Sequence, residues 1–200
     1  MTEERKNRIE TVLNRRQTNL TIVLEDVEDP RNITAVMRTA DAVGVQDVYV
    51  INSGRPVLKK FGYRSGRGAA KWVTVNQFTT VEECFEELRK NFSVILTTHL
   101  SSDAVDLYAI DFKESVALVF GNEQDGVSEK ARSLADGNFI IPQMGMVQSL
   151  NISVACAVSI YEAYRQKKQA GHYEQSGMPA DRMATLKAEW GLEEEGGGDI

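Results

Sequence analysis

Short apolar runs alternate along the chain with longer amphipathic stretches, and this alternation constrains the fold more than any other feature of the sequence. A run of about four to eight apolar residues is typical of a buried strand, whereas apolar residues three and four positions apart are typical of a helix. A helix between two such strands predicts a parallel crossover, so we expect an α/β domain with a mostly parallel sheet. The predicted strands are 20–27, 47–52, 72–78, 93–100, 115–121 and 138–142, and the predicted helices are 33–43, 81–91, 128–135 and 149–171.

The composition is that of an ordinary globular protein, with 200 residues, 42% hydrophobic and 26% charged. This length suits one sizeable domain with helical extensions. No apolar run approaches the ~18 residues of a transmembrane helix, and no apolar segment follows the charged start MTEERKNRIE, so neither a membrane span nor a secretory signal is predicted. Cys84 and Cys156 lack CxxC spacing, and His99 and His172 are the only histidines, so we expect free thiols, no metal site and a cytoplasmic location.

The net charge of −6 hides an uneven distribution of charge. Residues 1–72 carry 13 Lys and Arg against 9 Asp and Glu, whereas residues 73–200 carry 10 against 20. The first part of the chain can therefore meet a polyanion even though the whole protein is acidic.

Residues 53–71 combine six basic side chains, no acidic residue, four glycines and two aromatic residues, Phe61 and Tyr63. Such a segment suits RNA, because the cations contact phosphates and the rings stack on unpaired bases. A solvated loop is the alternative, but six like charges repel one another unless a polyanion meets them. We therefore predict RNA binding by Arg55, Lys59, Lys60, Arg64, Arg67 and Lys71.

The chain begins with a predicted amphipathic helix, residues 3–17, in which Ile9, Val12 and Leu13 share one stripe. Basic residues surround the stripe, and the predicted RNA contacts among them are Arg8, Arg15 and Arg16. The tail has a helix-like start at EWGL and an acidic end. We expect three parts: a basic N-terminal helical arm (1–19), the main domain (20–171) and a C-terminal helical extension with an acidic tail (172–200).

Three segments place polar side chains directly after predicted strands, where open parallel sheets bind their ligands. The first is NITAVMR, in which Asn32 is a predicted helix N-cap. Arg38 interrupts the apolar stretch that follows, and a phosphate contact explains it better than a surface position. The second is LVFGNEQDGVS (118–128), where Gly121 permits a close approach of the backbone to a ligand and Glu123 follows. Taken alone, this second segment predicts only a turn.

The third segment is IIPQMGMVQSLNIS (140–153), where Ser149 is predicted to begin a long helix and Asn151 to lie in its first turn. One capping residue is expected at a helix start, and Asn is unfavourable inside a helix, so we expect one of the two to cap and the other to face a ligand. Exposed amide groups at such a helix start can hold a carboxylate or phosphate. No GxGxxG loop occurs, so a standard dinucleotide or Rossmann methyltransferase site is not predicted.

Taken together, NITAVMRTADAVGV, LVFGNEQDGVS and IIPQMGMVQSLNISVACAVSIYEA resemble the three motifs of the SpoU branch of the SPOUT RNA methyltransferases, in particular the TrmH-type tRNA 2′-O-methyltransferases. Their order and spacing match as well. The resemblance implies that residues 20–171 form a methyltransferase domain whose parallel sheet carries a deep C-terminal trefoil knot. It also implies that loops at the knot bind S-adenosylmethionine (AdoMet), and that the enzyme is a homodimer with its active site assembled across the interface.

The resemblance further implies roles for single residues. It makes Arg38 the residue that contacts or activates a ribose 2′-hydroxyl. The polar groups that fix the geometry around it would be Asn32, Glu123, Ser149 and Asn151, and the cofactor contacts would be His99, Gly121, Ile141 and Leu150. No metal is implied.

The implied reaction is methyl transfer from AdoMet to a ribose 2′-hydroxyl, and the short arms resemble those of tRNA enzymes that act on guanosine 18 in the D-loop. Methylation of ribosomal RNA or of another tRNA position is the alternative within the same class. A catalytically silent RNA-binding protein is the alternative from another class, and the intact polar set argues against it. An enzyme acting on a small molecule is the third alternative, and the basic segment 53–71 argues against it.

Overall fold

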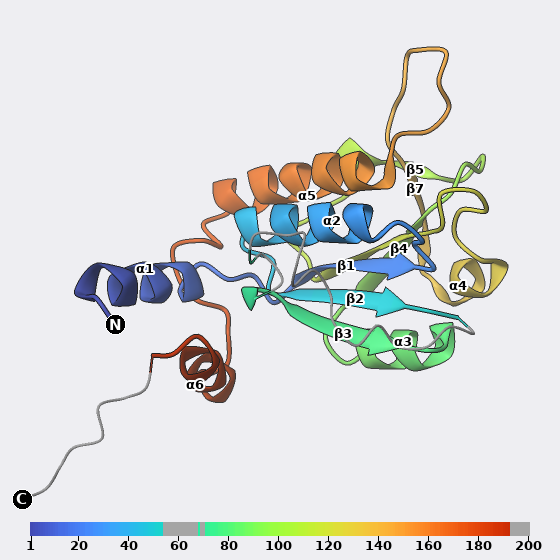
Figure 1. Cartoon of the computed structure of the whole chain (residues 1–200). Coiled ribbons are helices and arrows are strands. Elements are labelled where there is room, and N and C mark those ends of the chain that lie inside the picture. The colour runs from blue at the N-terminus through green and yellow to red at the C-terminus, as the bar shows by residue number, and fades with distance from the viewer. Residues whose placement is uncertain (54–67, 69–70, 193–200) are drawn as a thin grey trace, which may run out of the picture.

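The computed structural model describes residues 1–53, 68 and 71–192. Its centre is a seven-stranded sheet in the order β3-β2-β1-β6-β4-β7-β5, and every pair of neighbouring strands is parallel (Figure 1). The strands are β1 (Leu20–Glu25), β2 (Asp47–Ile51), β3 (Thr74–Phe78), β4 (Val94–Thr98), β5 (Val105–Asp106), β6 (Val116–Phe120) and β7 (Gly137–Ile140). The prediction of an α/β domain with a parallel sheet is confirmed. The two-residue β5 is an addition to the predicted strands.

Helices cover both faces of this sheet. α2 and α5 lie side by side on one face, and α3 and α4 lie on the other (Figure 1). The helices are α1 (Glu3–Leu13), α2 (Pro30–Ala42), α3 (Val81–Leu88), α4 (Glu129–Leu134), α5 (Ile152–Gln169) and α6 (Ala180–Glu189), with a short 3-10 helix at Leu107–Ala109. The C-terminal extension is helical as predicted, but EWGL ends its helix instead of starting one.

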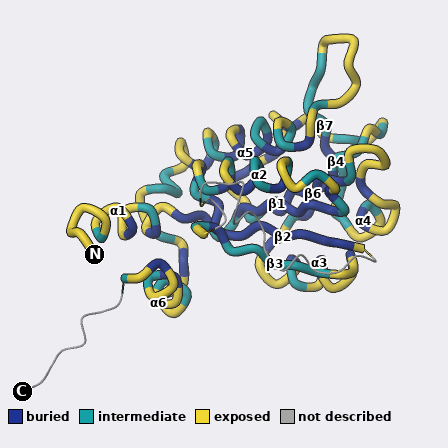
Figure 2. The backbone as a smooth tube through the Cα atoms, viewed as in Figure 1, coloured by how far each residue is buried: buried dark blue, intermediate teal, exposed yellow. Residues whose placement is uncertain are grey.

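Burial on both faces explains why the central strands are apolar without alternation. Every residue of β1, β2 and β6 is buried (Figure 2). On β1, Ile22 and Leu24 belong to the cluster under α2 and α5, which includes Ile160. Val23 points the other way and belongs to the cluster under α3 and α4, which includes Phe85. The carboxyl ends of these strands are therefore held by packing from two sides.

The two terminal helices form a small cluster of their own near the amino ends of the central strands (Figure 1). Ile9 and Leu13 of α1 pack with Met178, Leu186 and Trp190 of the C-terminal extension. This agrees with the predicted apolar stripe on the first helix. The two arms are thus one packed unit, although they come from opposite ends of the chain.

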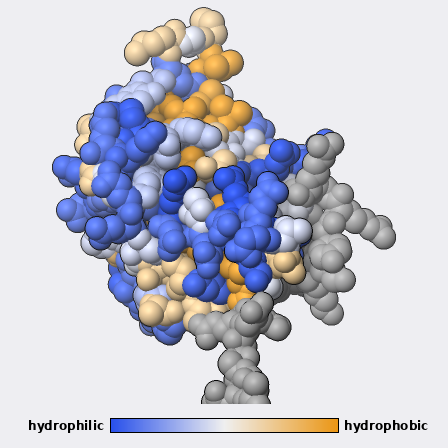
Figure 3. Space-filling model, turned by 90° about the vertical axis from the view of Figure 1, so that its left-hand side faces the viewer, coloured by the Kyte–Doolittle hydropathy of each residue, from blue (hydrophilic) through white to orange (hydrophobic). Residues whose placement is uncertain are grey.

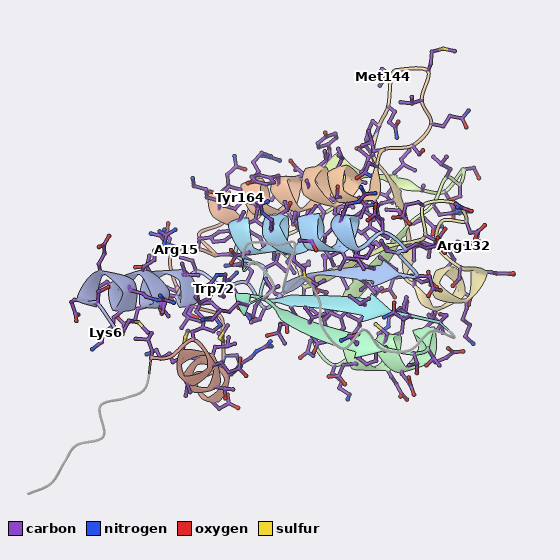
Figure 4. All side chains as sticks on the ribbon, viewed as in Figure 1. Lys6, Arg15, Trp72, Arg132, Met144 and Tyr164 are labelled. Atoms are coloured by element: carbon purple, nitrogen blue, oxygen red, sulfur yellow. The ribbon has the colours of Figure 1, made fainter. Side chains whose placement is uncertain are left out.

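Arg16 joins this unit to the sheet, and the prediction that it binds RNA is wrong because its side chain is fully buried. Its guanidinium donates to Asp41 Oδ1 at 2.5 Å and to the Trp72 carbonyl at 2.9 Å, and it lies 5.2 Å from the centroid of the Trp190 ring. Figure 4 shows Trp72 at this junction. Burial lowers the pKa of Arg16 while Asp41 opposes that shift. A buried cation is tolerated only where it is paired in this way.

Both cysteines, Cys84 and Cys156, are buried free thiols as predicted. Burial raises the pKa of each thiol, so both stay protonated at neutral pH. Within the described ranges, no helix is long and apolar enough to cross a bilayer. The same part of the chain has no group of three or more His, Cys, Asp and Glu residues placed to hold a metal ion.

Candidate active site

The three polar segments meet at the carboxyl edge of the sheet. β1 leads into α2, β6 leads into a turn at residues 121–128, and β7 leads into the loop of residues 141–151 that precedes α5. β6 lies next to β1 in the sheet, and β4 separates β6 from β7. Ligands of open parallel sheets bind at this edge. The fold therefore brings together side chains that are about 120 residues apart in the sequence.

Asn32 stands at the centre of a hydrogen-bond network that joins all three segments. Its Nδ2 donates to Glu123 Oε1 at 2.8 Å, and its Oδ1 accepts from Asn151 Nδ2 at 3.2 Å. A side-chain amide can serve both neighbours in one orientation only, because its nitrogen donates and its oxygen accepts. The second carboxylate oxygen of Glu123 lies 3.5 Å from the Glu28 amide N, which donates to it. Asn32, Glu123 and Asn151 thus hold one another in place.

The turn that carries Glu123 is closed by its neighbour, Asn122. Asn122 exchanges two backbone hydrogen bonds with Gly126, at 3.0 and 2.9 Å, and its side-chain oxygen accepts from the amide N atoms of residues 124 and 125. The sequence predicts that Gly121 leaves room for a ligand. Gly121 does line the cavity described below, and a Cβ at this position would also overlap the backbone of Gly126. The turn itself requires the glycine.

α5 begins at Ile152, three residues later than the sequence predicts, and Asn151 is its N-cap. Asn151 Oδ1 accepts from the Ser153 amide N at 2.9 Å and from the Ser153 hydroxyl at 2.6 Å, while its Nδ2 donates to Asn32. One residue therefore caps the helix and also joins the network. The prediction that Ser149 begins the helix is wrong, because Ser149 precedes it and is exposed, but Ser149 does line the cavity described below.

α2 begins at Pro30, and its N-cap is Asp29, so the prediction that Asn32 caps this helix is wrong. Asp29 Oδ1 accepts from the Arg31 amide N at 2.8 Å, and Pro30 suits the first helical position because no N–H needs a partner there. The Arg31 guanidinium also donates to Asp29 and lowers the pKa of that carboxyl, so the cap stays charged. With Asp29 as the cap, the Asn32 side chain is available to the network.

A cavity of about 660 Å³ opens beside the network, between the ends of β4, β6 and β7 and the start of α5. Small-molecule sites in proteins measure roughly 300–1,000 Å³. The four predicted cofactor residues all line the cavity: His99, Gly121, Ile141 and Leu150. Glu123, Ser149 and Asn151 line it as well. Phe120, Phe139 and Ile152 supply apolar surface. The cavity is therefore open to solvent and lined by both apolar and polar side chains.

The prediction misses several polar residues that line this cavity, Gln143 among them, and it also misses Arg132, which contacts the lining residue His99. Gln143 lines the cavity, and its Oε1 is buried without a hydrogen-bond partner. Arg132 of α4, labelled in Figure 4, donates from Nη1 to His99 Nε2 at 2.8 Å. Because a guanidinium only donates, His99 accepts this hydrogen bond at Nε2. The position of Gln143 one residue after Pro142, where β7 leaves the sheet, is the signal that could have indicated it.

Arg38 lies on α2 but outside the network. Its side chain is exposed and does not line the cavity, and within the described part of the chain it has no hydrogen bond or ion pair. Arg38 is six positions after Asn32, which corresponds to about 9 Å along the helix. The structure therefore brings together Asn32, Glu123 and Asn151 but leaves Arg38 at the surface of the same helix.

The predicted RNA-binding residues divide into three groups. Arg8, Arg15 and Lys71 are exposed, and Figure 4 shows Arg15 near the junction of the terminal helices with the sheet. Arg16 is buried, as described above. The remaining residues, Arg55, Lys59, Lys60, Arg64 and Arg67, lie outside the described residues.

Residues 19–161 match the model of the SpoU rRNA Methylase family. This span contains all seven strands and the three polar segments. The chain belongs to this family. The resemblance of the three motifs is thereby confirmed for most of the chain, and the network of Asn32, Glu123 and Asn151 falls within the matched residues.

Named relatives align with nearly the whole of this sequence. The chain is 42% identical over 191 residues to the tRNA (guanosine(18)-2′-O)-methyltransferase of Thermus thermophilus, and the aligned region covers 94% of this chain and 96% of that protein. It is 40% identical over 193 residues to the Escherichia coli K12 enzyme of the same name, covering 96% and 83% respectively.

Solved structures of the family share the fold. The Aquifex aeolicus TrmH/SpoU tRNA modifying enzyme has a TM-score of 0.86 and 32% identity, covering 94% of this chain and 95% of that one. An AdoMet-bound rRNA methyltransferase from Sinorhizobium meliloti has a TM-score of 0.66 and 28% identity, covering 78% and 59%. SpoU-type methyltransferases of this fold therefore include proteins that bind AdoMet.

Proposed function

We propose that this protein is an AdoMet-dependent tRNA 2′-O-methyltransferase that methylates the ribose of guanosine 18 in the D-loop. The network of Asn32, Glu123 and Asn151 at the mouth of a cofactor-sized cavity is the observation that carries the proposal. The names of relatives that are 40–42% identical over nearly the whole chain support the choice of nucleotide.

The cavity fits AdoMet in size and in chemistry. Bound AdoMet supplies an electrophilic methyl group on its sulfonium. Ile141 and Leu150 offer apolar contact to the adenosine part, and the unpaired Oε1 of Gln143 is an acceptor suited to a donor group of the cofactor. His99, held by a hydrogen bond from Arg132, adds a polar group at the same cavity.

Arg38 has the role of contacting the ribose 2′-hydroxyl and the neighbouring phosphate. A guanidinium stays protonated in proteins, so Arg38 acts as a donor that orients and neutralises rather than as a base. It projects from the same helix as Asn32, and the network therefore fixes the helix that carries it. Glu123, Ser149 and Asn151 would help to hold the hydroxyl for the transfer, which would leave S-adenosylhomocysteine and release the hydroxyl proton to solvent.

The RNA surface combines the exposed basic residues Arg8, Arg15 and Lys71 with the basic segment 53–71. Phosphate contacts of this kind supply affinity that depends on salt concentration and little on sequence. Since tRNA is the substrate in this proposal, we also place the enzyme in the cytoplasm.

A homodimer is part of the same proposal. Met144 and Met146, in the loop of residues 141–151, are 96% and 98% exposed, and Val154 and Tyr161 lie exposed on the outer side of α5. In Figure 3 hydrophobic surface lies directly below the projecting loop at the top of the molecule. Exposed apolar side chains that lie close together favour a contact with another protein, and a second copy of the chain is the partner that the family resemblance implies.

The trefoil knot is also a proposal. Its support is the fold shared with the Aquifex aeolicus TrmH/SpoU enzyme and the sheet order β1-β6-β4-β7, in which β4 pairs with two strands that follow it in the sequence. True knots are rare in proteins, so this feature distinguishes the family from ordinary doubly wound folds.

Methylation of defined RNAs tests the proposed function. The enzyme is incubated with labelled AdoMet and either unmodified tRNA or 23S rRNA, and the modified nucleotide is mapped. We expect 2′-O-methylguanosine at position 18, and no label in a transcript that carries 2′-deoxyguanosine there. Label only in rRNA, or at another tRNA nucleotide, would favour the alternative within the class. RNA binding without any methylation would favour the silent RNA-binding protein.

A further inference from the structure

Glu25 is an acidic residue at a position that the fold buries. It is the last residue of β1, and only 2% of it is exposed. Successive side chains of a strand point to opposite faces, so Glu25 shares with Val23 the face that α3 and α4 cover. Within the described part of the chain, its Oε1 is buried without a hydrogen-bond partner. A buried polar atom of this kind costs folding free energy, so the residue calls for a reason other than stability.

The other carboxyl oxygen of Glu25 holds one end of the turn of residues 121–128. Its Oε2 accepts from the Ser128 amide N at 3.0 Å. Ser128 is also the N-cap of α4, and its hydroxyl accepts from the Ala131 amide N at 3.1 Å. The hydrogen bond to Glu25 therefore ties the turn to β1 at the point where the turn passes into α4.

The opposite end of the turn is tied to the residue that follows Glu25. Asn122 Nδ2 donates to the Asp26 carbonyl at 2.9 Å. Two consecutive residues at the end of β1 thus hold both ends of the turn, and Glu123 lies between the two attachments. Residues 121–126 all line the cavity, and Glu123 also accepts from Asn32. A displacement of either end would move this wall of the cavity and Glu123 with it.

We propose that Glu25 is a positioning residue, whose carboxyl group holds the Ser128 end of the turn against β1 and so keeps Glu123 within reach of Asn32. The inference rests on the proposed function and adds a residue to the same site. The described residues that line the cavity do not include Glu25, so it acts through the turn and not by contact with the cofactor. Its physical basis is that the rate of a reaction between bound groups depends steeply on their placement.

Two substitutions separate the hydrogen bond from the burial of the side chain. Glu25→Met keeps a side chain of similar length and removes the acceptor, whereas Glu25→Gln keeps an oxygen for the Ser128 amide. In Glu25→Met the lost hydrogen bond and the removal of the unpaired Oε1 have opposite effects on stability, so Tm should stay within about 4 °C of the wild type. We expect kcat for tRNA methylation to fall about tenfold in Glu25→Met and to stay within about threefold of the wild type in Glu25→Gln.

Amide hydrogen exchange measures the displacement of the turn without RNA or cofactor. The amides of Asn122 and Gly126 each donate to the carbonyl of the other, at 3.0 and 2.9 Å, and so close the turn. Their exchange should be at least about tenfold faster in Glu25→Met, because the turn has lost one of its two attachments to β1. The amides of β1 itself should exchange as in the wild type, since the strand pairs with β2 and β6 as before.

A matched control is Asp136→Ala. Asp136 precedes β7 at the amino edge of the sheet, and its carboxylate also accepts from a backbone amide, that of Ile95, at 2.7 Å. This variant should lower Tm, because the hydrogen bond is lost, but it should leave both kcat and the exchange of the Asn122 and Gly126 amides unchanged.

A wild-type kcat in Glu25→Met would overturn the proposal. Equal losses in Glu25→Met and Glu25→Gln would also overturn it, because only the second variant keeps the acceptor, and so would a loss that merely follows a lowered Tm. In a Glu123→Ala background, Glu25→Met should lower kcat by less than about threefold, because the residue that it positions is already absent. An undiminished loss in that background would contradict a route through Glu123.

Failure of the proposed function would be seen separately, as absence of label with the wild-type enzyme. In that case the amide exchange decides. Faster exchange at Asn122 and Gly126 in Glu25→Met, with wild-type exchange in Glu25→Gln, would support the positioning role, and unchanged exchange in Glu25→Met would overturn it.

Discussion

Replacing Lys167 with methionine should stabilise the protein at pH 7. Lys167 is fully buried in α5, and its Nζ donates to the Glu114 carbonyl at 3.2 Å. Burial lowers the pKa of Lys167 from 10.5 to about 8, while Asp111 and Glu114 oppose the shift. At pH 7 the buried amine is therefore still mostly charged, at a cost in folding free energy.

The size of the effect follows from that pKa. A shift from 10.5 to about 8 corresponds to about 3 kcal/mol, because each pKa unit is about 1.4 kcal/mol. Methionine has a similar length and fills the same space, but loss of the hydrogen bond to the Glu114 carbonyl offsets about 1 kcal/mol of this gain in stability. The net gain is about 2 kcal/mol, which raises Tm by about 4–8 °C in a domain of this size.

The stability difference between Lys167→Met and the wild type should also depend on pH. The folded pKa of Lys167 lies below the unfolded value, so the folded protein binds fewer protons between pH 8 and 10.5. The cost of the charge is fully present below pH 8 and disappears as the pH rises through this window. The advantage of Lys167→Met over the wild type should therefore shrink between pH 7 and pH 10.

Urea unfolding of both proteins at pH 7 and pH 10 measures this advantage. Lys168→Met is the control, because Lys168 is the exposed neighbour on the same helix and should change stability by less than about 0.5 kcal/mol. The reasoning is refuted if Lys167→Met is less stable than the wild type at pH 7, or if its advantage is the same at both pH values.

Three further substitutions test other parts of the molecule. Gly121→Ala should disrupt the turn at residues 121–128 and lower the free energy of unfolding in urea by at least about 4 kcal/mol, because its Cβ would overlap the Gly126 backbone. Gly145→Ala is the control and should be neutral, because a Cβ at position 145 would have no atom within 4 Å. Arg16→Met should cost about 3 kcal/mol by the same measurement, because the Asp41 carboxylate and the Trp72 carbonyl lose their donor, and a neutral result would contradict the importance of this ion pair. Arg38→Ala should lower kcat for tRNA methylation by at least about 100-fold while calorimetry shows unchanged AdoMet binding, and retained turnover would remove Arg38 from the mechanism.

The sheet and its helices were largely predictable from the sequence because burial dictates composition. Strands covered on both faces must be apolar throughout, and the runs in β1, β2 and β6 carry that signal directly. β5 carries no such signal, since both of its residues, Val105 and Asp106, are exposed. Its pairing with β7 depends on a contact between segments about 30 residues apart.

Helix starts were less predictable, since each offered more than one capping residue. Asp29 with Pro30 at the first helical position competes with Asn32, and Ser149 competes with Asn151. In both places the residue that caps is decided by where the loop leaves the sheet. The burial of Arg16 was equally hidden, because its partners Asp41 and Trp72 come from distant parts of the chain.

The candidate site was predictable only in part. Polar residues after strands indicated where ligands bind, but neither periodicity nor spacing could show that Asn32 bonds to both Glu123 and Asn151. The resemblance of the motifs supplied that grouping. Gln143 and Arg132 were missed because a glutamine in a loop and an arginine on a short helix are ordinary surface residues until the cavity is seen.

The convergence of the three segments into one catalytic unit is tested most directly by the kcat of Asn32→Ala, Asn151→Ala and the double variant on saturating tRNA and AdoMet. Each single variant should lose about 100-fold, and the double variant little more, because residues that act as one unit are strongly non-additive. If the two losses multiply to about 10,000-fold, Asn32 and Asn151 act independently and the network is not the basis of the site.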